Sequence, residues 1–202
     1  MARMTSIGFD LDNTVINYDL SAQKYGQKIG IEGVRSISEL KSKLKDGKLA
    51  VDEWTRAQSW IYGEGLAHAT IQRDFLPLLE QLADREYSIY VVSHKTQFGP
   101  IQFGSVPFVE FTLKWLNNSS LGSILEKNVN LFFEETRRLK VQRISQLNLD
   151  FFVDDLVEVI NDKYFPEHTI GILYGDSPLG PKEPQRVIQN FSQLFNIVAA
   201  SE

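Results

Sequence analysis

The stretch that decides the fold is Ser6–Val15, which reads SIGFDLDNTV. Together with Thr5, its first residues form a short apolar run typical of a buried strand, and the run ends directly at Asp10. Asp12 follows two positions later. An aspartate after a strand is commonly only a turn residue, so the weight of this segment depends on what the rest of the chain places beside it.

Four more apolar runs have the length and composition of strands, and helical patterns lie between them. Such alternation of strands and helices predicts an α/β fold with a parallel sheet. The further strands are expected at Ser88–Val92 before Ser93, Val129–Phe133 before Glu134 and Glu135, Phe151–Val153 before Asp154, and Thr169–Tyr174 before Gly175.

Three helices can be placed around these strands from apolar spacing and end signals. The first begins after Asp74, which we expect to act as its cap. The second covers 140–147, with Ile144 and Leu147 on one face. The third is expected to begin at Pro184, a residue that suits the first helical position, and to carry the apolar stripe Val187, Ile188, Phe191, Leu194 and Phe195.

The interval 19–73 has a different character. It holds helical patterns at 38–45 and 52–62, several glycines and no convincing strand. We therefore expect a helical insert over 19–73, and a core formed by 1–18 and 74–202. The segment 97–128 is long for a crossover and receives no role beyond packing.

Composition excludes several classes of protein. The chain has 202 residues, 43% hydrophobic and 23% charged, which fits a soluble globular protein. Its net charge of -5 argues against non-specific binding to nucleic acid or anionic membrane. There are no cysteines, so disulfides and thiolate metal sites are excluded. Without a signal-peptide pattern or a run of about 18 apolar residues, the expected compartment is the cytoplasm.

Several polar side chains stand at predicted strand ends, and this is the pattern that carries chemistry. Ligands of open parallel sheets bind beyond the carboxyl ends of the strands. Asp10, Asp12, Ser93, Asp154 and Asp155 are therefore expected to converge. Carboxylates gathered in this way repel one another unless a cation holds them, and hard oxygen ligands suit Mg²⁺. One carboxylate can then attack phosphorus to form an acyl phosphate, while a second acts as the acid and base.

Four segments resemble the motifs of the haloacid dehalogenase superfamily, in that family's order. They are FDLDNTV at 9–15, VVSHKT at 91–96, LKVQRISQL at 139–147 and FFVDDLVEV at 151–159. The resemblance implies a Rossmann-like parallel sheet sandwiched by helices, with the insert at 19–73 as a small helical cap. It also implies a magnesium-dependent phosphohydrolase that acts on a small phosphorylated metabolite.

The same resemblance assigns roles to individual residues. Asp10 would be the nucleophile and a magnesium ligand, and Asp12 the general acid and base, with its backbone carbonyl as a further ligand. Thr14 would brace the loop and contribute to phosphate binding. Asp154 would bind magnesium, with Asp155 assisting directly or through water.

The remaining roles concern the phosphoryl group. Ser93 would donate a hydrogen bond to a phosphoryl oxygen, and His94 beside it is a further candidate for binding phosphate. Lys140 would neutralise charge in the transition state. The family often has proline after this lysine, where this chain has Val141, so Arg137 or Arg138 stays open as the source of the positive charge.

Two other functions stay open at this point: a phosphomutase with the same motifs, and a non-catalytic module that only binds phosphate. An intact acid at position 12 argues against the second, because mere binding needs no proton transfer. A two-component receiver domain is excluded, because its phosphorylated aspartate follows a middle strand, and the middle strands here end in Ser93 and Glu134. Neither the substrate nor the oligomeric state can be read from the sequence.

Overall fold

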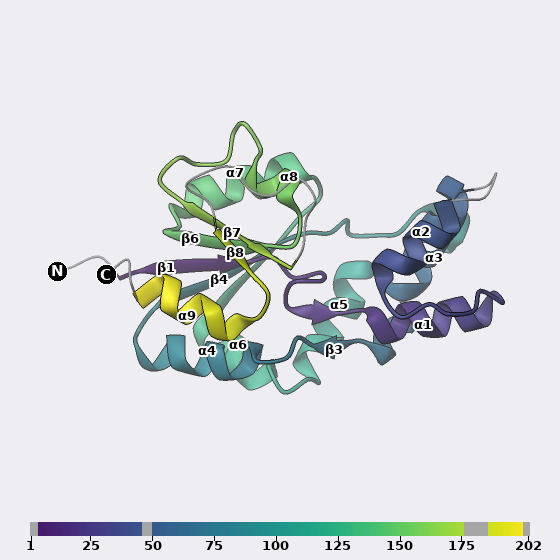
Figure 1. The fold of residues 1–202 in the computed structure, drawn as a ribbon, viewed down its shortest axis with the longest axis horizontal. Coiled ribbons are helices and arrows are strands. Elements are labelled where there is room, and N and C mark those ends of the chain that lie inside the picture. The colour runs from purple at the N-terminus through teal and green to yellow at the C-terminus, as the bar shows by residue number, and fades with distance from the viewer. Residues whose placement is uncertain (1–3, 46–49, 176–185, 200–202) are drawn as a thin grey trace. The chain divides into compact units, whose positions relative to one another are not determined.

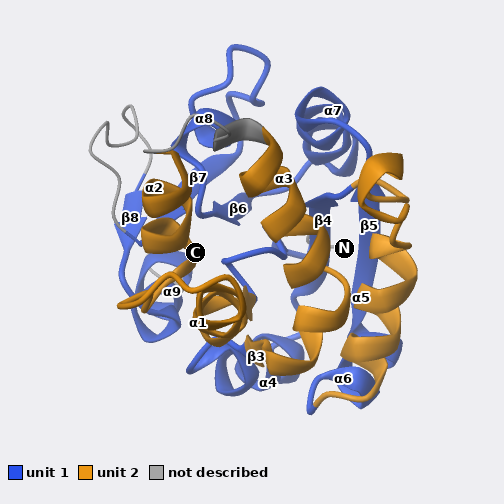
Figure 2. Cartoon of the chain, turned by 90° about the vertical axis from the view of Figure 1, so that its right-hand side faces the viewer, with its two compact units in different colours: residues 1–15, 71–95, 120–202 blue, residues 16–70, 96–119 orange. Residues whose placement is uncertain are grey.

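A computed structural model of the chain describes residues 4–45, 50–175 and 186–199. The chain forms two compact units, coloured separately in Figure 2. Unit 1 comprises residues 1–15, 71–95 and 120–202, and unit 2 comprises residues 16–70 and 96–119.

Unit 1 is built on a six-stranded sheet in which every neighbouring pair of strands is parallel. This confirms the predicted α/β fold with a Rossmann-like parallel sheet. In spatial order the strands are β5 (Val129–Glu134), β4 (Ser88–His94), β1 (Ser6–Phe9), β6 (Phe151–Asp154), β7 (Ile170–Tyr174) and β8 (Arg186–Ile188).

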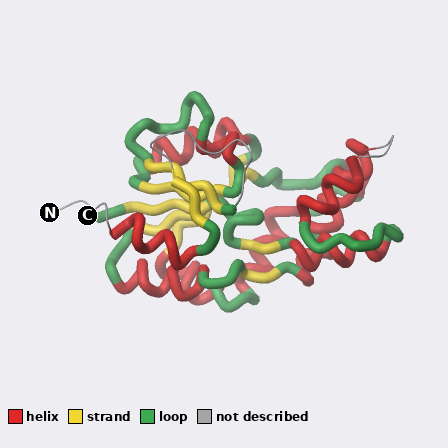
Figure 3. The backbone as a smooth tube through the Cα atoms, in the orientation of Figure 1, coloured by secondary structure: helices red, strands yellow, loops and turns green. Residues whose placement is uncertain are grey.

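Helices cover both faces of this sheet (Figures 1 and 3). One face carries α7 (Arg137–Leu147) and α8 (Val157–Ile160). The other face carries α4 (Phe75–Asp84), α6 (Gly122–Asn128) and α9 (Phe191–Ala199). The sheet is therefore buried on both sides, as expected for parallel strands that are nearly all apolar.

Each face has its own core. Under α7 and α8 lies a cluster of fully buried apolar residues that includes Val92, Ile144 and Phe152. Gly8 in β1 belongs to this face, where a Cβ would lie 2.6 Å from a ring carbon of Phe152, so the close packing depends on glycine. On the other face the rings of Phe9, Phe75 and Phe191 form a triangle with centroids 5.0 to 6.0 Å apart.

Unit 2 is helical apart from a short two-stranded sheet of β2 (Ile16–Asn17) and β3 (Thr70–Ile71), whose last residue belongs to unit 1. Its first segment carries α1 (Asp19–Lys28), α2 (Ile37–Lys45), α3 (Ala50–Ile61) and the 3₁₀ helix η1 (Glu64–His68). Its second segment carries the 3₁₀ helix η2 (Ile101–Phe103) and α5 (Phe108–Asn117).

The second segment of unit 2 corrects the predicted division of the chain, which placed only 19–73 in the insert and 97–128 in the core. Residues 96–119 pack with 16–70 instead. Tyr62 after α3 meets Phe108 of α5 with ring centroids 5.5 Å apart. At Gly63 a Cβ would lie 2.8 Å from Val106, so the two segments approach too closely for a side chain there.

Three expectations about helix starts differ from the structure: the first residue of α7, the first residue of α9 and the capping role of Asp74. The helix expected at 140–147 begins three residues earlier, at Arg137. Val187 and Ile188 lie in the edge strand β8, and the last helix begins only at Phe191. Pro184, its expected first residue, lies outside the described residues. Asp74 does precede α4, but its side chain makes no capping hydrogen bond and its backbone is left-handed, with φ 65°.

Candidate active site

The candidate site lies at the carboxyl end of β1, where the order of the strands reverses. The chain goes from β1 to β4 and β5 on one side and then returns to β6 on the other side of β1. Ligands of open α/β sheets bind at such a switch point. Phe9 is in register with Val153, so Asp10, just after β1, lies beside Asp154, the last residue of β6.

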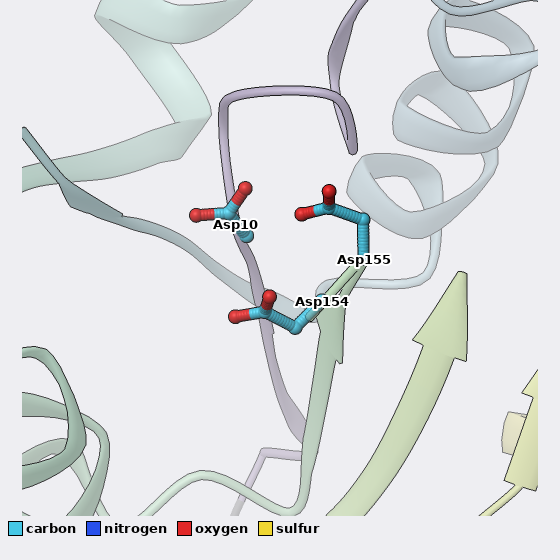
Figure 4. Close-up of side chains that lie close together, drawn as sticks. All are labelled: Asp10, Asp154 and Asp155. Carbon is cyan, nitrogen blue, oxygen red and sulfur yellow. The ribbon is translucent and has the colours of Figure 1, made fainter. Parts of the chain in front are cut away.

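Three carboxylates meet there (Figure 4). One oxygen each of Asp10, Asp154 and Asp155 lies within 4.8 Å of the others, a spacing that a single metal ion can bridge. Asp10 is 5% exposed and Asp154 is fully buried, while Asp155 is half-buried. The predicted convergence of these three acids from distant parts of the sequence is therefore present in the structure.

Lys140 of α7 contacts two of these three acids. Its ammonium forms ion pairs with Asp10 and, at 2.6 Å, with Asp154. The side chain of Lys140 is 1% exposed, whereas Arg137 and Arg138 are exposed. Lys140, and neither arginine, is thus the cation that reaches the acids.

Local sequence explains how Lys140 comes to lie there. Thr136 caps α7 by accepting a hydrogen bond from the backbone N–H of Leu139 at 3.2 Å, and this fixes where the helix starts. Lys140, Val141 and Ile144 then form the buried side of the helix. A positive charge in the first turns of a helix interacts unfavourably with the positive end of the helix dipole. The burial of the Lys140 ammonium therefore depends on the carboxylates that it contacts.

The surroundings of the site disfavour the ionised forms of its acids. The pKa of Asp10 is raised to about 7: burial raises it most, Lys140 lowers it, and the nearby charges of Asp154 and Asp12 raise it further. Burial and the charges of Asp10 and Asp154 also raise the pKa of Asp155 well above its usual range. One lysine is therefore insufficient to balance the acids of this cluster.

This donor set fits a hard divalent cation. Carboxylate oxygens are the ligands that Mg²⁺ prefers, and a bound dication would favour the ionised form of each acid. Asp10, Asp154 and Asp155 are the residues that would hold it. The carboxylate of Asp12 is not part of this group, and a role for its backbone carbonyl stays a prediction.

The loop after β1 is held against β6 by Thr14. Its hydroxyl oxygen, in a fully buried side chain, accepts a hydrogen bond from the backbone N–H of Asp155 at 3.1 Å. Asn13 adopts a left-handed backbone with φ 64°, a conformation that asparagine tolerates well. These contacts fix Asp155 relative to the loop that carries Asp10, as expected of a bracing residue.

Ser93 and His94 end β4 with different surroundings. The Ser93 hydroxyl is fully buried and has no hydrogen-bond partner among the described residues. A buried hydroxyl of this kind costs free energy unless a ligand or water satisfies it. His94 is exposed, and partial desolvation together with the charge of Lys140 lowers the pKa of its imidazole.

Lys95, a possible phosphate contact that we expected to be solvated on its loop, is buried in this site. Its ammonium lies 2.8 Å from an oxygen of Asp12, and its side chain is 2% exposed. A lysine on a loop is usually solvated, and the burial of this one depends on its ion pair with Asp12. Its backbone N–H donates to the carbonyl of Glu134 at 2.9 Å, which holds the loop close to the end of β5.

Comparison with known proteins agrees with this architecture. No protein-family model matches the sequence, and no curated protein does. Solved structures do match. A haloacid dehalogenase-like hydrolase from Streptococcus pneumoniae aligns at 13% identity and TM-score 0.63, over 96% of this chain and 98% of its own. A predicted phosphatase from Clostridium acetobutylicum aligns at 15% identity and TM-score 0.60, over 98% of this chain and 100% of its own.

A predicted phosphoglycolate phosphatase from Haemophilus somnus also aligns, at 16% identity and TM-score 0.57, over 98% of this chain and 99% of its own. The chain therefore has the haloacid dehalogenase-like fold, and the resemblance inferred from its four motifs extends over nearly its whole length. Identities this low establish the shared fold and leave chemistry to be argued from the site. Among the described residues, no helix has the length and hydropathy needed to cross a membrane.

Proposed function

We propose that this protein is a magnesium-dependent phosphohydrolase that cleaves phosphate monoesters of small metabolites through a phosphorylated Asp10. The observation that carries the proposal is the contact between the buried Lys140 and two acids of a three-carboxylate cluster at the switch point. A buried ammonium beside acids that could hold a cation supplies the positive charge needed when an anionic phosphoryl group approaches an anionic nucleophile.

The first step is attack by a carboxylate oxygen of Asp10 on phosphorus. The bond from phosphorus to the ester oxygen breaks, and an acyl phosphate forms on Asp10. Lys140 offsets negative charge on the nucleophile and on the transferring group, and the Ser93 hydroxyl is free to donate to a phosphoryl oxygen. Preorganised donors of this kind typically lower a barrier by about 3 kcal/mol each.

Asp12 supplies the proton transfers in this proposal. Its acid form protonates the leaving ester oxygen, and its carboxylate then removes a proton from the water that attacks phosphorus and regenerates Asp10. Lys95 holds the Asp12 side chain at 2.8 Å, so the group that moves protons has a fixed position.

The cation would be held by Asp10, Asp154 and Asp155. When bound, Mg²⁺ supplies positive charge that favours ionised Asp10 and offsets the charge of the phosphoryl oxygens. Thr14 supports this site indirectly, because it anchors the backbone of Asp155.

Unit 2 is proposed to serve as the cap that selects the substrate. Its first segment interrupts unit 1 between β1 and α4, the position predicted for a cap, and its second segment follows β4. Both insertions therefore leave unit 1 directly after strands whose ends carry candidate site residues.

Hydrolysis of p-nitrophenyl phosphate tests the proposal. We expect release of p-nitrophenol that depends on Mg²⁺ and is abolished in Asp10→Asn, because an amide is a poor nucleophile. Asp84→Asn is the matched control, since Asp84 is exposed at the end of α4, a helix that leads to the opposite, amino-terminal end of β4.

A rate that survives Asp10→Asn would overturn the proposed nucleophile. Steady release of phosphate into water also distinguishes hydrolysis from phosphomutase chemistry, which needs a bisphosphate for sustained turnover. Binding of phosphate esters without any turnover would leave only the phosphate-binding module.

A further inference from the structure

Unit 2 contains a pocket of its own, separate from the acids of unit 1. Its volume is about 720 Å³, within the range of pockets that bind small molecules. All of its lining residues belong to unit 2, and both segments of that unit contribute.

Two helices and one loop form its walls. Tyr25 and Lys28 come from α1 and Ile29 from the cap at its end, and Arg56, Ser59 and Trp60 come from α3. In each helix these residues have the i, i+3, i+4 spacing that puts side chains on one face. The third wall comes from residues 102–104, 106, 107 and 111 of the second segment.

The walls combine aromatic faces with positive charge. The Lys28 ammonium lies 5.3 Å from the centre of the Trp60 ring, and the Arg56 guanidinium lies 5.2 Å from that of Phe103. The carboxylate of Glu64, which also lines the pocket, accepts a hydrogen bond from the indole N–H of Trp60 at 3.1 Å. The Arg56 side chain is 57% exposed and pairs with the carboxylate of Glu53 at the long distance of 3.8 Å.

Tyr25 supplies an independent sign of a ligand. The residue is 2% exposed, and its buried hydroxyl has no hydrogen-bond partner within the described ranges. Burial and the charge of Glu53 raise the pKa of the phenol, so it stays a proton donor at neutral pH. An unsatisfied buried hydroxyl costs free energy that a hydrogen-bond acceptor on a ligand would recover.

We infer that this pocket binds a small, planar aromatic anion, distinct from the phosphoryl group that unit 1 is proposed to process. The aromatic ring packs among Trp60, Phe103 and Tyr25. The negative group of the ligand pairs with Lys28 and Arg56 and accepts a hydrogen bond from the Tyr25 hydroxyl. An apolar ligand would leave Lys28 and Arg56 without a negative partner, and a non-aromatic anion could not stack on the aromatic rings.

Calorimetric titration of the full chain with 2-naphthoate tests this assignment. Two matched probes accompany it: 2-naphthylmethanol, which keeps the ring without the charge, and cyclohexanecarboxylate, which keeps the charge without the aromatic ring. We expect 2-naphthoate to bind at least about 10-fold more tightly than either, because ring stacking and ion pairing each contribute in that range.

Variants locate the binding. Arg56→Gln and Tyr25→Phe are each expected to weaken binding of 2-naphthoate by roughly 5- to 10-fold. Lys41→Gln is the matched control: Lys41 lies 5.5 Å over the ring of Trp54, which is also on α3, and neither residue lines the pocket. The Lys41→Gln variant is expected to bind 2-naphthoate with the affinity of the wild type.

Asp10→Asn separates this inference from the proposed function. It should abolish hydrolysis and leave 2-naphthoate binding unchanged, because the pocket lies wholly in unit 2. Equal affinity for the three probes would overturn the inference. So would an unchanged affinity in Arg56→Gln or Tyr25→Phe, or a loss of binding in Asp10→Asn.

Discussion

Removal of one charge from the acidic cluster should stabilise the metal-free protein, and the size of the effect follows from Asp10. The pKa of this carboxyl is raised from 3.8 to about 7 in the folded chain. Each pKa unit corresponds to about 1.36 kcal/mol, so ionising Asp10 costs the folded state on the order of 4 kcal/mol at alkaline pH. The substitution Asp10→Asn, which cannot ionise, avoids this cost.

The sign follows from which state binds the proton more tightly. Since the folded state holds the proton up to about pH 7, the contribution of this group is fully present below pH 3.8. It is lost as the pH rises through 7. Roughly 3 kcal/mol of the loss falls between about pH 5 and about pH 8, and Asp10→Asn should gain stability relative to wild type by that amount over the same interval.

Urea unfolding followed by circular dichroism measures the free energy of unfolding. The wild type, Asp10→Asn and the control Asp84→Asn are compared in the presence of a chelator. Added Mg²⁺ should reverse the order at about pH 8, because a ligand at 100 times its dissociation constant stabilises the folded state by about 2.7 kcal/mol. The reasoning is refuted if, without metal, the Asn variant gains no stability relative to wild type between the two pH values.

Three further substitutions test individual contacts. Lys140→Met should lower kcat for p-nitrophenyl phosphate by about 10²- to 10³-fold, because the ammonium that pairs with Asp10 is lost; an unchanged kcat would exclude its role. Ser93→Ala should lower kcat by about 10²-fold with a change in unfolding free energy below about 1 kcal/mol, since its hydroxyl has no partner in the part of the chain that the structure describes. Thr14→Val should cost about 1 kcal/mol in urea unfolding and weaken Mg²⁺ binding in calorimetry, because it leaves the Asp155 N–H without its acceptor; equal Mg²⁺ affinity would show that this anchor is dispensable.

Periodicity predicted the core of unit 1 well because its strands are short apolar runs that end in polar residues. Each of the five strands read from the sequence is present to within one or two residues. The sixth strand of the sheet, β8, was not predicted. Val187 and Ile188 fit the apolar stripe that continues into α9, and this stripe predicts a helix. A strand of three residues is too short to show the alternation that would distinguish it from a helix.

The site could be predicted as far as it depends on strand ends. Asp10, Asp154 and Asp155 follow strands that neighbour one another in the sheet, so their convergence follows from topology. Lys95 and Lys140 depend on packing instead. A lysine is exposed in most settings, and only the three-dimensional arrangement of acids made burial of these two favourable.

The extent of unit 2 was beyond sequence reasoning for a related cause. Residues 96–119 show no pattern that ties them to 16–70, and they join that unit through contacts such as Tyr62 with Phe108. Long-range packing of this kind depends on shape, which a single sequence does not display.

The central claim is that Asp10 carries the phosphoryl group, and chemical trapping tests it most directly. The protein is mixed with p-nitrophenyl phosphate and Mg²⁺, quenched, and treated with borohydride, which reduces an acyl phosphate to an alcohol. Mass spectrometry should then find position 10 converted to homoserine, only when both substrate and Mg²⁺ were present, and most strongly in Asp12→Asn, where release of the phosphoryl group is slowed. Conversion at any other carboxylate, or turnover in Asp12→Asn with position 10 unmodified, would contradict the account.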